Sequence, residues 1–275
     1  MNSRLLTLVA LLLATGGCNQ RHPIFNSPAL PSETPTLQIG QPAVFGVSME
    51  PPGVIGPASA TGKVLLTLPA LAGGTEVLLK SSDPSVLSVP GSVVVPAGSD
   101  TAVFAGTVQG VASDRDVQVT ASTAGGRSVT TTISVWKLVP TFCFFWSDPG
   151  DYIGGGATRR MVPPSYRFSA SSSGSRVSLS LNGPSWWYLD FQAPKNAPLA
   201  VGTYEGATRY PFQAPSVPGL SVSGDGRGCN QLSGRFTVRE IDVAPNGRVR
   251  NFWATFEQHC ERGTAALFGE VRVTQ

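Results

Sequence analysis

Turn-forming residues interrupt this chain about every eight to twelve positions, and the runs between them are short and rich in β-branched side chains. Gly occurs 31 times and Pro 23 times among the 275 residues, and no long stretch shows the periodicity of an amphipathic helix. Short apolar runs at regular spacing between turns are typical of β-sandwiches and β-barrels. The sequence therefore predicts an all-β protein.

The first eighteen residues have the pattern of an export signal. A positive charge at Arg4 precedes an apolar run over residues 5–14, and small residues then lead to Cys18. A basic start, a short apolar core and a small-residue exit are typical of a cleaved signal peptide. The run is shorter than the roughly 20 residues that a membrane-spanning helix needs. One interpretation is an ordinary signal peptide that is cut somewhere after Ala14.

The same segment resembles the lipobox of bacterial lipoproteins because its small residues end on a cysteine, although Thr15 stands where such boxes usually have Leu. The resemblance implies that residues 1–17 are removed and that the thiol of Cys18 receives diacylglycerol. Two or more acyl chains anchor a protein stably, where one gives marginal binding. We therefore expect a lipid-anchored protein of the cell envelope. The outer membrane or cell surface is favoured, because Asn19 stands where Asp would favour the inner membrane.

Residues 18–36 form a Pro-rich linker, and chains of that composition are extended and semi-rigid. Residues 37–136 predict one β-sandwich with candidate strands at 43–49, 63–68, 76–80, 86–89, 92–95, 101–108, 116–123 and 128–136. In the last two strands apolar residues recur at every second position. This period places one strand face in a core and the other in solvent.

The segment 37–136 resembles a known kind of module, and three runs in it carry the resemblance. The runs are SSDPSVLSVPGSVVVPAGSDTAVFAGTV at 81–108, DVQVTAS at 116–122 and SVTTTISV at 128–135. They look like the immunoglobulin-like (Ig-like) repeats of bacterial surface and secreted proteins. The resemblance implies an Ig-like sandwich with a spacing or adhesive role and without catalytic residues.

Residues 137–275 predict a second antiparallel β-sandwich, or a jelly-roll-like domain, with candidate strands at 138–146, 166–170, 176–181, 186–191, 209–212, 233–243, 249–257 and 265–273. A hairpin over 233–257 turns at Pro245-Asn246-Gly247, because Asn-Gly supplies the positive φ of a tight turn. The apolar positions of its first arm change parity, which predicts a β-bulge near Arg239-Glu240. The segments at 149–156, 201–212 and 223–230 resemble a domain of uncharacterised bacterial exported proteins, which implies no activity.

Four cysteines occur, at positions 18, 143, 229 and 260. The two arms of the predicted hairpin bring Cys229 and Cys260 together, so a disulfide between them is geometrically natural and fits an oxidising compartment. Cys143 lies in an apolar run and is interpreted as a buried small hydrophobe. A bridge from Cys143 to another cysteine is the alternative, because connectivity cannot be read from sequence.

Evidence for catalysis is weak. Of the two histidines, His22 lies in the linker and His259 lies beside Cys260, and neither a nucleophile elbow nor a zinc-protease motif is present. A nucleophile pair of Cys143 and His259 is the less favoured hypothesis. We therefore predict a non-enzymatic protein without cofactor or metal. A hydrolase with its site in the C-terminal domain is the alternative.

The acidic residues favour surface and turn roles. Glu240, Glu257 and Glu270 are predicted on adjacent strands, and we interpret them as a solvated face that pairs with Arg239, Arg250 and Arg272. Asp148, Asp151 and Asp225 lie in Gly-containing turns that lack calcium-loop spacing, which favours turn chemistry. The net excess of three basic residues is scattered, which excludes a nucleic-acid footprint.

The run Trp186-Trp187-Tyr188 is the candidate ligand-binding feature. Adjacent strand residues point to opposite faces, so one face carries Trp187 and the other carries Trp186 and Tyr188. If one face is core, the other exposes a ring that can stack on a sugar or contact a protein, unless loops cover it as well. We expect a structural, adhesive or ligand-binding surface protein, whose partners are the membrane, through its anchor, and a glycan or another surface protein.

Overall fold

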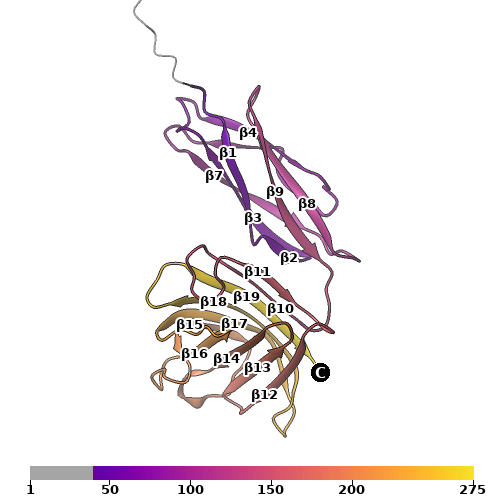
Figure 1. The fold of residues 1–275 in the computed structure, drawn as a ribbon, viewed down its shortest axis with the longest axis vertical. Helices are drawn as coiled ribbons and strands as arrows, with labels where there is room; N and C mark the ends of the chain where they lie inside the picture. The colour runs from indigo at the N-terminus through magenta and orange to yellow at the C-terminus, as the bar shows by residue number, and fades with distance from the viewer. Residues whose placement is uncertain (1–39) are drawn as a thin grey trace, which may run out of the picture. The chain divides into compact units, whose positions relative to one another are not determined.

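The computed structural model describes residues 40–275, so the predicted signal peptide, Cys18 and the linker lie outside the described residues. The predicted all-β class is confirmed, with sheets that pack as sandwich-like domains (Figure 1). One short 3-10 helix, Pro194–Asn196, occurs in this range. No helix in the described part is long and apolar enough to cross a membrane.

The strands of residues 44–136 form two sheets. One sheet has the order β1-β3-β7-β5 and the other has the order β2-β9-β8-β4-β6. Their bounds are β1 Val44–Glu50, β2 Gly53–Ile55, β3 Ala58–Leu66, β4 Thr75–Ser81, β5 Leu87–Ser88, β6 Ser92–Val95, β7 Thr101–Val108, β8 Arg115–Ser122 and β9 Ser128–Trp136.

The period-two pattern of the sequence sorts this first sandwich into core and surface. In β8 the side chains of Val117, Val119 and Ala121 are buried, and in β9 those of Ile133 and Val135 are buried, while the residues between them are not. Both sheets contribute side chains to one hydrophobic cluster. The sequence did not predict β2, because three residues between prolines carry no readable period; β2 pairs with β9 in parallel.

The strands of residues 142–274 form one ten-stranded sheet with the order β11-β10-β19-β18-β17-β15-β16-β14-β13-β12. Their bounds are β10 Phe142–Ser147, β11 Thr158–Met161, β12 Arg167–Ser172, β13 Arg176–Asn182, β14 Trp186–Gln192, β15 Gly202–Arg209, β16 Gly219–Gly224, β17 Leu232–Val243, β18 Val249–Cys260 and β19 Ala266–Thr274.

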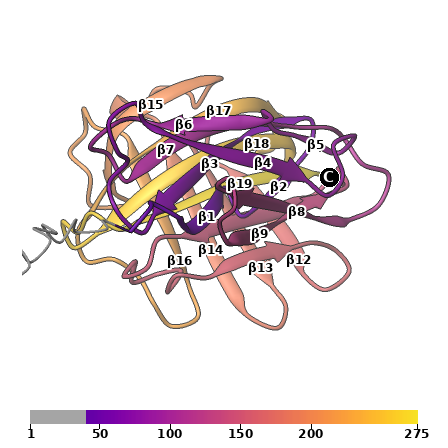
Figure 2. The same ribbon diagram turned by 90° about the horizontal axis from the view of Figure 1, so that it is seen from above.

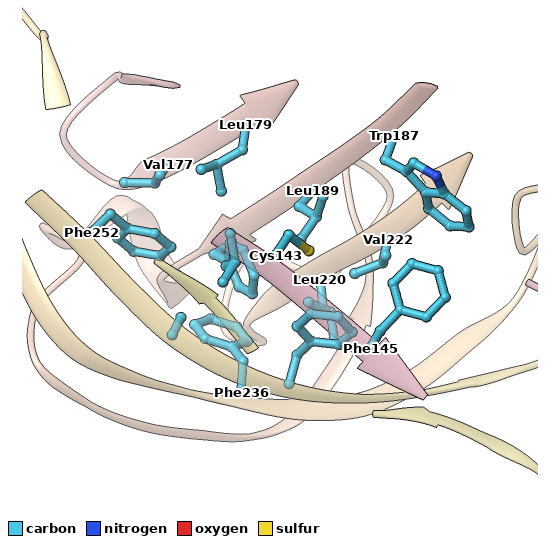
Figure 3. Close-up of a cluster of buried hydrophobic side chains, with 14 of the residues drawn as sticks. Cys143, Phe145, Val177, Leu179, Trp187, Leu189, Leu220, Val222, Phe236 and Phe252 are labelled. Carbon is cyan, nitrogen blue, oxygen red and sulfur yellow. The ribbon is translucent and has the colours of Figure 1, made fainter. Parts of the chain in front are cut away.

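This sheet folds back on itself around a single core. The ring of Phe191 on β14 lies 5.3 Å from that of Phe236 on β17 and 5.4 Å from that of Phe252 on β18, although two strands separate β14 from β17 in the sheet order. Figure 3 shows side chains from β10, β13, β14, β16, β17 and β18 that point into this shared cluster. The inner face is therefore mainly apolar, and the outer face carries most of the polar side chains together with an aromatic group of Phe144, Trp146 and Phe268.

Three strands of this sheet were not predicted. The sequence predicts no strand in the segments of β11 and β16, nor in β15 before Arg209, and the strand predicted at 209–212 is wrong beyond Arg209, where the chain turns. The alternation of apolar and polar residues in β15 is interrupted because the pairing of β15 with β17 shifts register between Tyr204 and Ala207. Gly206 in this interval has a φ of +64°. A bulge of this kind moves apolar residues out of strict alternation.

The hairpin of β17 and β18 is the longest in the chain and has the predicted features. Its register shifts between Val238 and Glu240, which leaves Arg239 as the extra residue of the predicted bulge. At the turn the positive φ belongs to Gly247 alone, at +81°. The predicted disulfide joins Cys229 to Cys260 at the open end, with 5.2 Å between their Cα atoms. Closing a loop of this length stabilises the fold by about 3–4 kcal/mol in the chain-entropy model.

A buried polar side chain links the two walls of this core. Gln258 on β18 is fully buried, and its amide accepts a hydrogen bond from the backbone nitrogen of Val222 at 2.8 Å and donates one to the carbonyl of Val222 at 2.9 Å. Strand β15 pairs with β16 only at Gly219 and Leu220. At Val222, β16 no longer has β15 as a partner, and the amide of Gln258 takes the place of that strand. It pairs the backbone N–H and C=O of Val222, which would otherwise be costly to bury.

We predict that Gln258→Leu lowers the free energy of unfolding by about 2–6 kcal/mol, because it leaves a buried N–H and a buried C=O unpaired at about 1–3 kcal/mol each. Urea unfolding measures the change. The control is Gln118→Leu on β8, an exposed position where a change within about 0.5 kcal/mol is expected. Equal losses in both variants would contradict the assigned role of Gln258.

Candidate functional site

The aromatic run on β14 divides between the two faces of the sheet. Trp187 is fully buried, whereas Trp186 and Tyr188 keep 44% and 47% of their surface exposed. Figure 3 shows Trp187 directed into the core near Phe145 and Val222. The buried ring is therefore unavailable to a ligand, and the candidate binding feature reduces to Trp186 and Tyr188.

Trp187 holds β14 in place. Its indole Nε1 donates a hydrogen bond to Oγ of Ser185 at 2.9 Å, and its ring lies 4.6 Å from that of Phe145. Gly224 on the paired strand β16 makes room for it, because a Cβ there would lie 2.4 Å from a ring carbon of Trp187. With the inner ring fixed in this way, alternation directs Trp186 and Tyr188 outward.

The two outer rings form a small aromatic platform. Their centroids are 5.6 Å apart and their planes are inclined by 51°. Tyr188 is paired in register with Ser180 on β13 and with Ser223 on β16, so short hydroxyl side chains flank it on both sides. Short neighbours leave the ring faces accessible. A large ring beside hydroxyl groups combines apolar contact with hydrogen bonding.

A groove of about 260 Å³ begins at Tyr188 and continues across β13 to the edge strand β12. Its lining is dominated by small hydroxyl side chains and is made of Ser169, Ala170, Ser171, Ser178, Leu179, Ser180, Tyr188 and Asp190. The strands are in register so that these serines form rows across the sheet. The groove can therefore offer several donors and acceptors on one surface.

Asp190 is the charged group of this groove. Its Oδ1 accepts a hydrogen bond of 2.5 Å from Oγ of Ser178, and Nε of Arg176 lies 3.9 Å from the same oxygen. Burial raises the pKa of the Asp190 carboxyl, and the Ser178 hydrogen bond and the Arg176 charge offset only part of that increase. A half-buried carboxyl among serines is an acceptor for the hydroxyl groups of a ligand.

The other candidate residues do not form a nucleophile pair. Cys143 is a free cysteine on the inner face of β10, where burial raises the pKa of its thiol far above the usual value. His259 lies on the outer face of β18, since its neighbour Gln258 is in the core, and its Nε2 is 3.0 Å from Oε1 of Glu257. The sheet separates these two side chains, so they cannot act together.

Of the three turn aspartates, only Asp151 bonds within its own turn, while Asp148 and Asp225 contact residues that are distant in the sequence. Asp148 accepts a hydrogen bond from the backbone nitrogen of Ala266, Asp151 accepts one from that of Gly154, and Asp225 pairs with Arg159 at 3.0 Å. Within residues 40–275 no three His, Cys, Asp or Glu side chains come together as a metal-binding group.

The three glutamates lie on the outer face, and only part of their expected pairing is present. Glu240 lies 3.4 Å from Arg272, Glu257 pairs with Arg235, and Glu270 accepts a hydrogen bond from the indole of Trp253. Arg250 pairs with Asp242 instead. Glu257 is directly opposite Arg235 in the register of the hairpin, and a second register shift between Asp242 and Val243 leaves Arg250 as an extra residue beside Asp242.

Comparisons with known proteins do not identify the chain. No family model matches it, and no curated protein matches it. One solved structure, a protein of unknown function from Bacteroides ovatus, matches with a TM-score of 0.28 and 7% identity, over 82% of this chain and 94% of that one. A similarity this weak carries no argument about function.

We predict that Asp190→Asn becomes more stable relative to the parent protein as pH rises from 3 to 7. An acid whose pKa is raised by folding stabilises the folded state most below its unfolded pKa of about 3.9, and this contribution is lost as pH rises through the folded pKa. Urea unfolding at each pH measures the difference. Asp242→Asn is the control, and it should become less stable relative to the parent protein as pH rises, because the Arg250 hydrogen bond lowers the pKa of Asp242. A pH-independent difference for Asp190→Asn would contradict the assignment.

Proposed function

We propose that this protein is a lipid-anchored surface protein of the bacterial cell envelope whose C-terminal domain binds carbohydrate. The observation that carries the binding proposal is the exposed ring of Tyr188 at the end of a serine-lined groove, with the exposed ring of Trp186 beside it. Sugar rings present C–H faces that pack on aromatic rings, and hydroxyl edges that exchange hydrogen bonds with serine and carboxylate groups. The groove offers both kinds of contact within three neighbouring strands.

The anchor proposal rests on the export signal and on Cys18 at its end. The Cys229–Cys260 disulfide supports an oxidising compartment outside the cytoplasm. The Pro-rich linker, if extended, reaches up to roughly 55 Å. The first sandwich then serves as an Ig-like spacer, a role supported by its short alternating strands around one hydrophobic cluster.

For sugar binding, we expect Trp186→Ala and Tyr188→Ala each to weaken the affinity of the mature protein for its glycan at least tenfold, which corresponds to about 1.4 kcal/mol. A glycan array identifies the ligand, and calorimetry measures the affinity. Phe45→Ala removes a ring that is even more exposed, at 67%, from β1 in the first sandwich and should leave affinity unchanged. If the intact protein binds no glycan, or if the Phe45 variant loses affinity equally, the binding proposal is wrong.

For the anchor, we expect the full-length protein expressed in a bacterium to be recovered in the membrane fraction, with a mass increased by acyl chains on Cys18. Cys18→Ala should abolish the mass increase and block cleavage before position 18. Mass spectrometry of the purified chain distinguishes these outcomes. A soluble, unmodified mature chain in the parent protein would show that the segment is an ordinary signal peptide.

A further inference from the structure

A second groove lies on the outer face of the C-terminal sheet. It has a volume of about 320 Å³ and crosses β19, β18, β17 and β15, with lining residues that extend from Trp146 on β10 to Glu205 on β15. It shares no lining residue with the serine-lined groove on β12, β13 and β14. The binding site proposed above therefore leaves this second groove without a role.

A row of three threonines crosses the middle of this groove. Thr255 on β18 is paired with Thr237 on β17, and Thr237 is paired with Thr203 on β15. Neighbouring strands lie about 4.8 Å apart, so the row places hydroxyl groups along about 10 Å of the sheet. The hydroxyls of Thr203 and Thr237 contact each other at 3.0 Å. We call this feature the threonine groove after this row.

Aromatic rings form one end of the threonine groove. Trp146 is paired with Phe268 across β10 and β19, and the two rings stack at 5.3 Å with an interplanar angle of 17°. The buried ring of Phe144 lies 5.2 Å from that of Trp146 and supports the stack from below the rim. Trp146 and Phe268 are only partly buried. An ordered aromatic surface beside hydroxyl groups suits the apolar face of a pyranose.

The charged groups of the groove largely neutralise one another. Nε and Nη2 of Arg235 lie 2.9 and 2.8 Å from Oε2 of Glu257, and its Nη1 lies 3.8 Å from Oε1 of Glu205. Three carboxyl and two guanidinium groups line the groove, so opposite charges nearly balance. Side chains oriented by such pairs can exchange hydrogen bonds with the hydroxyl groups of a ligand. This arrangement favours a neutral, polyhydroxylated ligand.

The β-bulge of β17 contributes a further donor. Arg239, the extra residue of the bulge, lines the groove and lies 5.5 Å over the ring of Trp253. Within residues 40–275 its guanidinium forms no ion pair, so its five N–H donors are available to a ligand. Glu270, which is paired with Thr255, adds a carboxyl acceptor at the same place. Donors and acceptors therefore lie on both sides of the threonine row.

The two grooves open on opposite sides of the C-terminal domain. The inner rings of Phe191 on β14 and Phe236 on β17 meet in the core at 5.3 Å, so these strands belong to opposite walls. Tyr188 points outward from the first wall and Thr237 from the second. Figure 2 shows β17 and β18 along one side of this domain and β12 and β13 along the other. One short oligosaccharide therefore cannot occupy both grooves.

We propose that the threonine groove is a second glycan-binding site, so that the C-terminal domain binds two glycan chains, one on each side. This inference rests on the proposed function, because it assigns the same class of ligand. Two sites on one domain can raise the affinity for a polymer by about 10²–10⁴-fold without a new contact. Loss of either site therefore weakens binding to a glycan polymer, although the other site remains. Such a domain bridges neighbouring glycan chains.

A short ligand separates the two sites. The probe is a soluble hexasaccharide of the neutral or N-acetylated sugar that the glycan array selects, titrated into the mature protein in a calorimeter. We expect two hexasaccharides per chain. Thr255→Arg places a long charged side chain across the threonine row and should leave one, and Tyr188→Ala should weaken the other site at least tenfold. Thr132→Arg, the same substitution at an exposed position of β9, should keep both sites.

A second variant guards against misfolding of the first. Phe268→Ala removes a ring from the threonine groove without adding charge, and it should weaken the same site as Thr255→Arg at least tenfold. Circular dichroism and thermal unfolding confirm that each variant is folded. The parent protein should also cross-link a soluble polysaccharide of the same sugar and raise its light scattering. Neither Thr255→Arg nor Tyr188→Ala should do so.

The outcomes distinguish this inference from the proposed function. One hexasaccharide per chain, bound with the same affinity after Thr255→Arg and Phe268→Ala, would overturn the second site and leave the serine-lined groove as the binding site. Binding that Thr255→Arg abolishes and Tyr188→Ala leaves intact would support the threonine groove and contradict the serine-lined one. If no sugar on the array is bound, both proposals are wrong.

Discussion

The side-chain amide of Gln258 completes the ladder of a strand that lies across the core from its own. Strand β15 leaves β16 after two paired positions, and without Gln258 the next backbone groups of Val222 would be buried and unpaired. Their satisfaction allows a ten-stranded sheet to fold back on itself around one apolar cluster. The disulfide from Cys229 to Cys260 closes the same end of the hairpin two residues further along β18. The folded-back sheet depends on these links because a single open sheet could not cover its own apolar face.

Folding back gives the sheet one inner and one outer face. Because successive side chains of a strand point to opposite faces, each residue's position along its strand decides whether its side chain is buried or exposed. On β14 parity buries Trp187 and exposes Trp186 and Tyr188. On β18 it buries Gln258 and directs Glu257 and His259 outward. Rigid strands hold such groups more exactly in place than loops do, because neighbouring strands restrain the backbone on both sides. The aromatic platform is therefore built on a strand whose inner residues are locked in the core.

The two outer surfaces differ in the chemistry that they offer. The surface on β12, β13 and β14 is rich in serine and holds one carboxyl, Asp190, beside an aromatic pair, which suits retention of a neutral polyhydroxylated ligand. The surface on β15, β17, β18 and β19 instead holds Glu205, Glu257 and Glu270 together with arginines, and Arg235 lies within ion-pair distance of both Glu205 and Glu257.

Much of this arrangement could be predicted from the sequence, because strands and their faces are local properties. The turn spacing predicted the all-β class, the parity change predicted the bulge at Arg239, and the hairpin predicted the Cys229–Cys260 bond. Strands β2, β11, β15 and β16 were missed because short or bulged segments carry no clear period. The carboxyl groups of Glu257 and Glu270 could be placed on adjacent strands, but their common groove could not.

The sequence by itself determined that Trp187 faces away from Trp186 and Tyr188, since alternation along a strand requires no knowledge of the neighbours. Which of the two faces is buried, and which side chains share the exposed one, was decided only by the tertiary structure. The physical reason is that cross-strand neighbours depend on sheet order, register and curling. Strand β14 lies between β13 and β16, a position that no local pattern encodes, and this order brings the serines of β13 beside Tyr188 and Asp190.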